Sequence, residues 1–317
     1  MNNDMRVIRQ EALGGPEVLN IATAPIPTLG LSQVLVRVEA TSLNPTDWVH
    51  RRVEGFLGSG PRVLGWDVAG TVVEVGLGVT IHQTGDRVFG MLPYPYGHGA
   101  AAEYVVAPAR ALATIPAGVD TTEAGVIPLV GLTAWQALVD TAHVGAGDRV
   151  LVHAAAGGVG HVAVQIAKAC GAYVIGTASE RNHEMVTVLG ADEVLDYQAP
   201  GYLDAVRVVD IVLDTVGSDC AARSLPVVRR GGTIVSLSLD TTPHLGEAAH
   251  DAGVAHHLML VEHDRQTMQE LGRLLDSGAL RPVIDQQVNA FDLDALRSAH
   301  AHGDAGHVAG KISVVLR

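Results

Sequence analysis

Residues 148–179, DRVLVHAAAGGVGHVAVQIAKACGAYVIGTAS, decide the fold because they contain the signals of a strand, a tight turn and a helix in that order. Residues 150–152 form a short apolar run, which is typical of a strand buried on both faces. From Gly158 onward apolar residues recur at steps of three and four, which predicts a helix with one apolar face that ends before Gly171. Residues 173–177 return to strand character, so the stretch predicts a β-turn-α-β unit.

The turn between that strand and helix reads AAGGVG over residues 155–160, the dinucleotide-binding pattern G-x-G-x-x-G with Ala155 in place of the first glycine. Gly157 would let a pyrophosphate approach the backbone, and Gly160 would let the helix pack closely on the strand. The free N–H groups at the helix start would face the phosphates. A purely structural turn is the alternative, but the flanking strand and amphipathic helix favour a nucleotide site. The candidate cofactor-binding residues of this turn are Ala156, Gly157, Gly158, Val159 and Gly160.

The composition is that of a globular protein with an acidic surface. The chain has 317 residues, of which 48% are apolar, and this length suggests two domains. A net charge of −13 would repel a polyanion over most of the surface, so nucleic acid is not an expected partner. No apolar run approaches the roughly 18 residues of a membrane span, and the N-terminus shows no apolar signal segment. The two cysteines form no Cys-x-x-Cys pair, which argues against a disulfide framework, and we expect a soluble, cytoplasmic protein without membrane partners.

The rest of the chain shows two kinds of strand pattern. Before residue 108, short strands are broken by Gly and Pro, which predicts an irregular β-barrel. After the turn described above, apolar runs with short crossovers follow at residues 189–197, 208–216 and 231–237. These runs predict a doubly wound parallel sheet of the α/β class, with ligands at its carboxyl edge. Residues 311–316 would form a closing strand.

Further short motifs accompany the turn along the chain. GLTAW precedes it at residues 131–135, and LGADEVLDY follows it at residues 189–197. SLNPTDW, GWDVAG, GDRVFG and AEYVV lie upstream, and SGALRPVID and GKISVVL lie downstream. With these motifs the chain resembles, over nearly its whole length, the zinc-independent NADPH:quinone oxidoreductase branch of the medium-chain dehydrogenase/reductase superfamily.

The resemblance implies a GroES-like β-barrel as the catalytic domain and a Rossmann domain that binds NADPH. The barrel domain would comprise residues 1–122 and 262–317, the Rossmann domain residues 123–261, and the active site would lie in the cleft. The implied reaction is hydride transfer from NADPH to a quinone or to the activated C=C bond of an α,β-unsaturated carbonyl compound. The resemblance also implies a homodimer that forms by pairing of edge strands at residues 256–261. Residues 1–4 precede the family-like sequence, and we expect them to be disordered.

Asn44, Trp48 and Thr133 are the catalytic candidates that the resemblance implies. It places Asn44 near the nicotinamide ring in a loop over residues 43–48, Trp48 in the substrate pocket and Thr133 on the nicotinamide side. The alternatives are that Asn44-Pro45 only makes a turn and that Thr133 only faces the core. Relatives often carry Tyr where Trp48 stands, and an indole N–H cannot deliver a proton as an acid, so the proton donor is unknown.

The sequence predicts no metal site. Zinc-dependent relatives have Gly-His-Glu where this chain has Gly65-Trp66-Asp67, and Trp66 cannot ligate a metal. The C-terminal histidines fit no tetrahedral motif and are expected to be exposed loop residues: His300, His302 and His307. A Pro/Gly-rich loop carries polar aromatic residues that would lie either at the substrate site or on the surface: Tyr94, Tyr96 and His98.

The end of the strand after the fingerprint helix favours NADPH over NADH. NAD-specific sites place an acid there, and its carboxylate would repel a 2′-phosphate. This chain instead offers Ser179 and Arg181, a hydroxyl and a guanidinium suited to phosphate oxygens. The resemblance adds Tyr197, and the carboxyl edge of the sheet adds Gly217. The cofactor candidates outside the turn are therefore Thr133, Ser179, Arg181, Tyr197 and Gly217.

Two other functions stay open. An enoyl-thioester reductase would need a basic entrance for a carrier protein or coenzyme A, and the only clustered candidates are Arg51, Arg52 and Arg62. A non-catalytic NADPH-binding protein is the second alternative, because no obvious proton donor replaces the missing tyrosine. Quinone reduction can take its proton from water, so that absence is not decisive.

Overall fold

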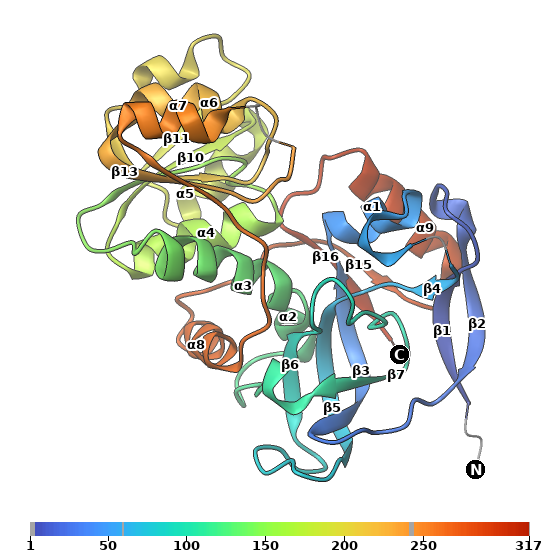
Figure 1. The fold of residues 1–317 in the computed structure, drawn as a ribbon. Coiled ribbons are helices and arrows are strands. Elements are labelled where there is room, and N and C mark those ends of the chain that lie inside the picture. Colours follow the sequence, from blue (N-terminus) through green and yellow to red (C-terminus); the bar gives the residue numbers. More distant parts are fainter. Residues whose placement is uncertain (1–3, 59, 241–243, 317) are drawn as a thin grey trace. The chain divides into compact units, whose positions relative to one another are not determined.

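The computed structural model describes residues 4–58, 60–240 and 244–316. These residues form two compact units, whose elements Figure 1 shows coloured along the chain. The first unit contains the described residues up to Leu132, Glu262–Gly278, and the described residues from Pro282 onward. The second unit contains Thr133–Val261 and Ala279–Arg281.

The first unit is built on two sheets. A seven-stranded sheet has the order β15-β16-β3-β5-β6-β8, with β7 also paired to β3, and a three-stranded sheet has the order β2-β1-β4. β3 is buried along most of its length and pairs with three neighbours, β5, β7 and β16, so it is the centre of the unit. The strands are β1 (Asp4–Gln10), β2 (Leu19–Pro25), β3 (Gln33–Leu43), β4 (Arg62–Val63), β5 (Asp67–Val75), β6 (Arg87–Met91), β7 (Tyr104–Pro108), β8 (Leu112–Thr114), β15 (Ile284–Asn289) and β16 (Lys311–Val315).

The segment after β3, expected as a loop, is a helix, α1 (Pro45–Arg52). Pro45 stands at its first position, where a fixed φ suits a helix, and the Asn44 N–H donates to Asp47 Oδ2 at 2.7 Å. This local cap makes a helix of a segment whose Asn-Pro pair indicated only a turn. The other helices of this part of the chain are α2 (Thr121–Gly125), α3 (Pro128–Trp135), α8 (Arg265–Asp276) and α9 (Leu293–Asp304).

The second unit is a doubly wound sheet, which confirms the predicted α/β class. Its six strands are parallel in the order β11-β10-β9-β12-β13-β14. The chain adds strands outward from β9 to β11, then returns to the other side of β9 at β12 and continues to β14. In Figure 1, α4 and α5 lie on one side of this sheet and α6 and α7 on the other. The elements are β9 (Arg149–Val152), α4 (Gly158–Ala169), β10 (Tyr173–Ala178), α5 (His183–Val188), β11 (Glu193–Asp196), β12 (Val209–Asp214), α6 (Cys220–Ser224), β13 (Val228–Ser236), α7 (Leu245–Ala252) and β14 (Ala255–Leu258).

The first unit extends further along the chain than the boundary expected at residue 122. A Cβ at Gly125 would lie 2.9 Å from Ala40 Cβ, so α2 lies directly on β3. The Leu129 N–H donates to Asp67 Oδ1 at 2.7 Å, which ties the start of α3 to β5. Residues 123–132 therefore belong with the first unit, and the division falls after Leu132. Of the extension expected to be disordered, residues 1–3 lie outside the described residues, and Asp4 is the first residue of β1.

Close packing of α4 on the end of β9 depends on Gly160. A Cβ at Gly160 would lie 2.2 Å from the Ala154 carbonyl oxygen and 2.7 Å from Ala155 Cα, closer than non-bonded atoms approach. Ala155 is fully buried, and a Cβ at Gly176 of β10 would lie 2.8 Å from the Ala155 methyl group. A glycine on the neighbouring strand therefore leaves room for alanine at the first position of the fingerprint.

We expect Gly160→Val to destabilise the second unit by about 3 kcal/mol or more, because the atoms that the new side chain meets belong to the backbone. Denaturant unfolding followed by circular dichroism measures the loss. The control is Gly246→Ala in α7, where a Cβ meets nothing within 4 Å, and it should be neutral or stabilising by up to about 1 kcal/mol. A Gly160→Val protein with wild-type stability would contradict the close packing.

Candidate functional site

The predicted nucleotide turn has the geometry that phosphate binding requires. The Gly157 N–H donates to the Ala154 carbonyl at 2.8 Å, and Ala154 adopts a left-handed φ of 48°, so the chain turns tightly after β9. Gly157 is the N-cap of α4, and no side chain of the described residues caps it, so the N–H groups of the first turn are left for another acceptor. Ala156 and Gly160 are buried, whereas Gly157, Gly158 and Val159 are half-buried. The residues present therefore fit a bound pyrophosphate.

Three of the predicted cofactor residues follow neighbouring strands at one edge of the sheet. Ala178 of β10 pairs with Asp196 of β11, so Ser179 and Tyr197 stand directly after paired residues. Arg181 is exposed in the short 3-10 helix after Ser179, and Tyr197 is 50% exposed. The structure thus brings Ser179, Arg181 and Tyr197 to the carboxyl ends of β10 and β11.

Gly217 lies in the loop after β12, which is hydrogen-bonded to β9. Its φ is 84°, a left-handed value that favours glycine, and Asp214 Oδ1 accepts from the N–H groups of Val216 at 2.9 Å and Gly217 at 3.0 Å. The sheet order reverses between β9 and β12, the place where ligands of doubly wound folds bind. Gly217 and the glycine-rich turn therefore lie at the same switch point.

His153 is a residue of this site that the sequence analysis missed. It directly follows β9, and its Nε2 lies 2.8 Å from Ser224 Oγ, while its Nδ1 lies 3.3 Å from Thr177 Oγ1. Because Ser224 donates its own proton to the Cys220 carbonyl at 2.8 Å, the His153 Nε2–H donates to Ser224 and Nδ1 accepts. Burial lowers the pKa of His153 to about 4, so it is a neutral link between β9, β10 and α6. The only signal in the sequence is a histidine directly after a buried strand.

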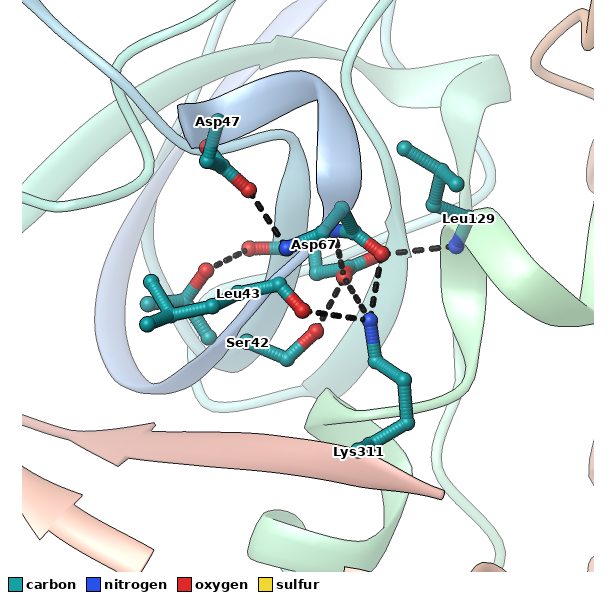
Figure 2. Close-up of polar contacts among 8 residues, drawn as sticks. Ser42, Leu43, Asp47, Asp67, Leu129 and Lys311 are labelled. Atoms are coloured by element: carbon teal, nitrogen blue, oxygen red, sulfur yellow. Dashed lines mark hydrogen bonds and ion pairs between the residues drawn. The ribbon is translucent and has the colours of Figure 1, made fainter. Parts of the chain in front are cut away.

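In the first unit, Asn44 belongs to a buried polar network around Lys311 and Asp67, which Figure 2 shows. The Lys311 ammonium donates to the Leu43 carbonyl at 2.9 Å and to Asn44 Oδ1, and it lies 3.8 Å from Asp67 Oδ2. That same carboxylate oxygen accepts from Ser42 Oγ and from Asn44 Nδ2 at 2.7 Å. Both ends of the Asn44 amide are thus engaged inside the protein, and Asn44 is 0% exposed.

A second carboxyl group, that of Asp47, lies beside this network. Oδ2 of Asp47 caps α1, while Oδ1 is buried and has no hydrogen-bond partner among the described residues. Burial, with the nearby Asp67 carboxylate, raises the pKa of Asp47 to about 7, and burial also lowers the pKa of Lys311. The network therefore holds one cation beside two carboxyl groups, and the Asp47 carboxyl takes up a proton near neutral pH.

The other predicted substrate-site residues differ in burial and in the elements that hold them. Trp48 is half-buried, and a Cβ at Gly303 would lie 2.5 Å from its ring atom Cζ3, so the indole packs on α9. Thr133 is buried in α3, in the second unit. Tyr96 is 74% exposed. Tyr94, in contrast, packs with Trp66 and other rings beside α1.

Two of the three arginines considered as a basic entrance for a carrier-bound substrate are buried. Arg51 is fully buried, where it donates to the Gly14 carbonyl, to His300 Nδ1 and to Asp304. Arg62 is also buried and donates to backbone carbonyls of residues 58 and 60, and Arg52 pairs with Asp304 at 3.3 Å.

Of the three C-terminal histidines, His307 is exposed outside the helices as expected, whereas His300 and His302 lie in α9. His300 is a buried residue of α9, and burial lowers its pKa to about 3, with the Arg51 guanidinium contributing. His302, also in α9, lies with Nε2 at 2.8 Å from Asp285 Oδ2.

The residues present do not fit a zinc site. Trp66 is fully buried, and its Nε1–H donates to the Pro95 carbonyl at 3.2 Å, so it is packed as a core side chain. Across residues 4–58, 60–240 and 244–316, no group of three or more His, Cys, Asp or Glu side chains could hold a metal ion. Within the same residues, no helix is both long and apolar enough to cross a membrane.

We expect Lys311→Met to cost roughly 3–5 kcal/mol of folding stability, because it leaves the Asp67 carboxylate buried without its counter-charge. The double variant Asp67→Asn/Lys311→Met should recover a large part of that loss. Thermal and urea unfolding followed by tryptophan fluorescence provide the measurement. Lys168→Met is the matched control, since its pair with Asp192 is solvent-accessible and should change stability by at most about 1 kcal/mol. The idea fails if the double variant is no more stable than Lys311→Met.

Comparison with known proteins agrees with both units. The model of the alcohol dehydrogenase GroES-like domain matches residues 30–117, and a model described as zinc-binding dehydrogenase matches residues 189–314. A chloroplast envelope quinone oxidoreductase homolog of Arabidopsis thaliana is 44% identical over 95% of both chains. An NADPH-dependent alkenal/one oxidoreductase of the same plant is 32% identical over 95% of this chain and 77% of its own. The structure of the quinone oxidoreductase from Coxiella burnetii superimposes with a TM-score of 0.91 at 35% identity, covering 99% of this chain and 100% of that one.

These matches extend over both units and include proteins named as quinone oxidoreductases. The chain belongs to the medium-chain dehydrogenase/reductase superfamily, in its zinc-independent quinone oxidoreductase branch.

Proposed function

We propose that this oxidoreductase uses NADPH to reduce quinones or the activated C=C bond of α,β-unsaturated carbonyl compounds. The observation that carries the proposal is the uncapped glycine-rich turn at the sheet's switch point, in a chain similar to relatives that are named for these two acceptor classes. The nicotinamide, when bound, supplies the hydride. The protein holds the dinucleotide at the turn and along the carboxyl edge, through Ala156–Gly160, Ser179, Arg181, Tyr197 and Gly217.

We assign the acceptor to the first unit, around the first turn of α1. Asn44 contributes there by fixing the start of α1, because its amide is held by Lys311 and Asp67. Trp48 remains the other proposed substrate residue of this unit, and Thr133, in the second unit, remains a proposed nicotinamide contact. A rigid helix start of this kind keeps the residues that face the acceptor in position.

Of the two alternatives, the carrier-dependent enoyl-thioester reductase loses its main support, because Arg51 and Arg62 are buried. A binding protein without turnover is the alternative that an experiment must separate. A homodimer that pairs through β14, the edge strand of the second sheet, is part of the proposal, as is a cytoplasmic location.

A panel of acceptors tests the function. NADPH oxidation should be fast with simple quinones or with small enones and alkenals. It should be slow with enoyl thioesters, because Arg51 and Arg62 are buried and offer no basic entrance for a carrier. Absorbance of the reduced nicotinamide measures turnover, and fluorescence titration measures NADPH binding. Stoichiometric binding of NADPH without oxidation across the whole panel would favour the binding protein instead.

The preference for NADPH rests on Arg181 in this proposal. Arg181 is exposed after β10, at the edge where the adenosine ribose of a dinucleotide lies in doubly wound folds. Arg181→Ala should weaken NADPH by about ten- to a hundredfold and leave NADH nearly unchanged, since a charge-assisted hydrogen bond contributes roughly 1.5 to 3 kcal/mol. Arg207→Ala is the matched control, because this exposed arginine precedes β12 and so lies at the amino edge of the sheet. Equal losses for both cofactors, or a wild-type preference for NADH, would refute the assignment.

A further inference from the structure

Tyr94 lies against the first turn of α1 and is held there by aromatic packing. Its ring centroid lies 5.4 Å from that of Trp66, 6.4 Å from that of His50 and 6.5 Å from that of Phe56. The side chain is half-buried, and its hydroxyl oxygen lies 3.1 Å from Thr46 Oγ1. The phenol is therefore fixed in position by contacts on several sides, beside the segment to which we assign the acceptor.

The hydrogen-bond pattern leaves the proton of the Tyr94 hydroxyl unused by the described residues. His50 Nδ1 lies 2.9 Å from the Thr46 carbonyl oxygen, which can only accept, so Nδ1 carries the ring proton. Thr46 Oγ1 lies 3.0 Å from the same nitrogen and cannot donate to it, so its own proton goes to the Tyr94 oxygen. Among the described residues the Tyr94 hydroxyl has no other hydrogen-bond partner, which leaves the phenolic proton available to a ligand.

The surroundings suit an acid that is protonated at rest. Burial raises the pKa of Tyr94, and the nearby Asp47 carboxyl also raises it, while the Thr46 hydroxyl opposes the shift. His50 faces the ring as a neutral group, since burial lowers its pKa. Thr46 also stands in the first turn of α1, where the helix dipole favours a negative charge. The phenol thus keeps its proton at neutral pH, and the helix start with the Thr46 hydroxyl stabilises the phenolate when it forms.

We propose that Tyr94 is the catalytic acid of the reduction, an inference that rests on the proposed function. Once the acceptor has gained a hydride, it carries an additional electron pair, as an enolate or a hydroquinone anion, and needs one proton. The O–H bond of Tyr94 breaks, its electrons stay on the phenolate oxygen, and the proton bonds to the acceptor. Water then returns a proton to the phenolate.

Three other groups around α1 do not fit this role. The Trp48 indole is not an acid in water, and the Asn44 amide is engaged at both ends. The carboxyl of Asp47 is buried at 1% exposed, and one of its oxygens caps α1. Among these groups, Tyr94 is the one with an acidic proton that no acceptor of the described residues takes.

Tyr94→Phe tests the assignment, because it keeps the ring and removes only the hydroxyl. With an enone, kcat should fall by about a hundredfold. With a quinone whose hydroquinone anion takes its proton from water, the loss should be much smaller. NADPH affinity and the melting temperature should stay at wild-type values. Tyr96→Phe is the matched control from the same loop and should leave both reactions unchanged, since Tyr96 is 74% exposed.

A second measurement follows the proton itself. A ring-fluorinated tyrosine at position 94 has a lower pKa, and its ionisation is visible in the absorbance of the resting protein. The enone rate should fall as the pH rises through that ionisation, whereas the wild-type rate stays flat over the same range. Thr46→Val should shift the ionisation to higher pH, because the phenolate loses a donor, and Thr46→Ser should restore it.

The outcomes separate this inference from the function on which it rests. An active wild-type protein whose Tyr94→Phe variant retains the enone rate would overturn the role of Tyr94 alone. Equal losses for enone and quinone, or a lowered melting temperature that accounts for the loss, would show a structural role instead. A wild-type protein that turns over no acceptor would overturn both.

Discussion

The first unit depends on one buried cation, the Lys311 ammonium. It joins the last strand, β16, to the end of β3 through the Leu43 carbonyl, to the cap of α1 through Asn44, and to β5 through Asp67. Asp67 in turn accepts the N–H of Leu129 and so fixes the start of α3. A buried charge is tolerated only with partners on all sides, so each of these segments must be in place for the others to hold their positions.

The chain uses lysine here although it strongly favours arginine. Of its 21 lysines and arginines only two are lysines, and Lys311 is the buried one. An ammonium is a compact charge whose three protons point in different directions, whereas a guanidinium is planar and larger. A backbone carbonyl, an amide oxygen and a carboxylate converge on Lys311 Nζ, and a compact donor suits them. Arginine serves elsewhere, as at Arg51, where acceptors lie further apart along the side chain.

The parts of the structure that the sequence predicted depend on local patterns. The strand, turn and helix over residues 149–169 were predictable because apolar spacing and glycine positions lie within one short stretch. Burial of Arg51 and His300 was not predictable, because they are bonded to each other across 249 positions of the chain. The loop expected at Asn44 became a helix for a related reason, since the Asn44 side chain is held by Lys311 and its backbone by Asp47. The position of Tyr94 is fixed by contacts with Thr46, His50 and Trp66. No regular spacing in the sequence connects these residues with Tyr94.

The order of the chain through the two units has a consequence for synthesis on the ribosome. The sheet of the second unit is made entirely from residues between 149 and 258, so all of its strands are translated in one continuous stretch. The first unit needs Lys311 and β16, which are translated after every other strand. Until then Asp67, Asn44 and the flank of β3 lack their partners, and the nascent barrel exposes an unpaired strand edge. The second unit can therefore complete its sheet before β16 is made, whereas the first unit needs β16 to cover the edge of β3.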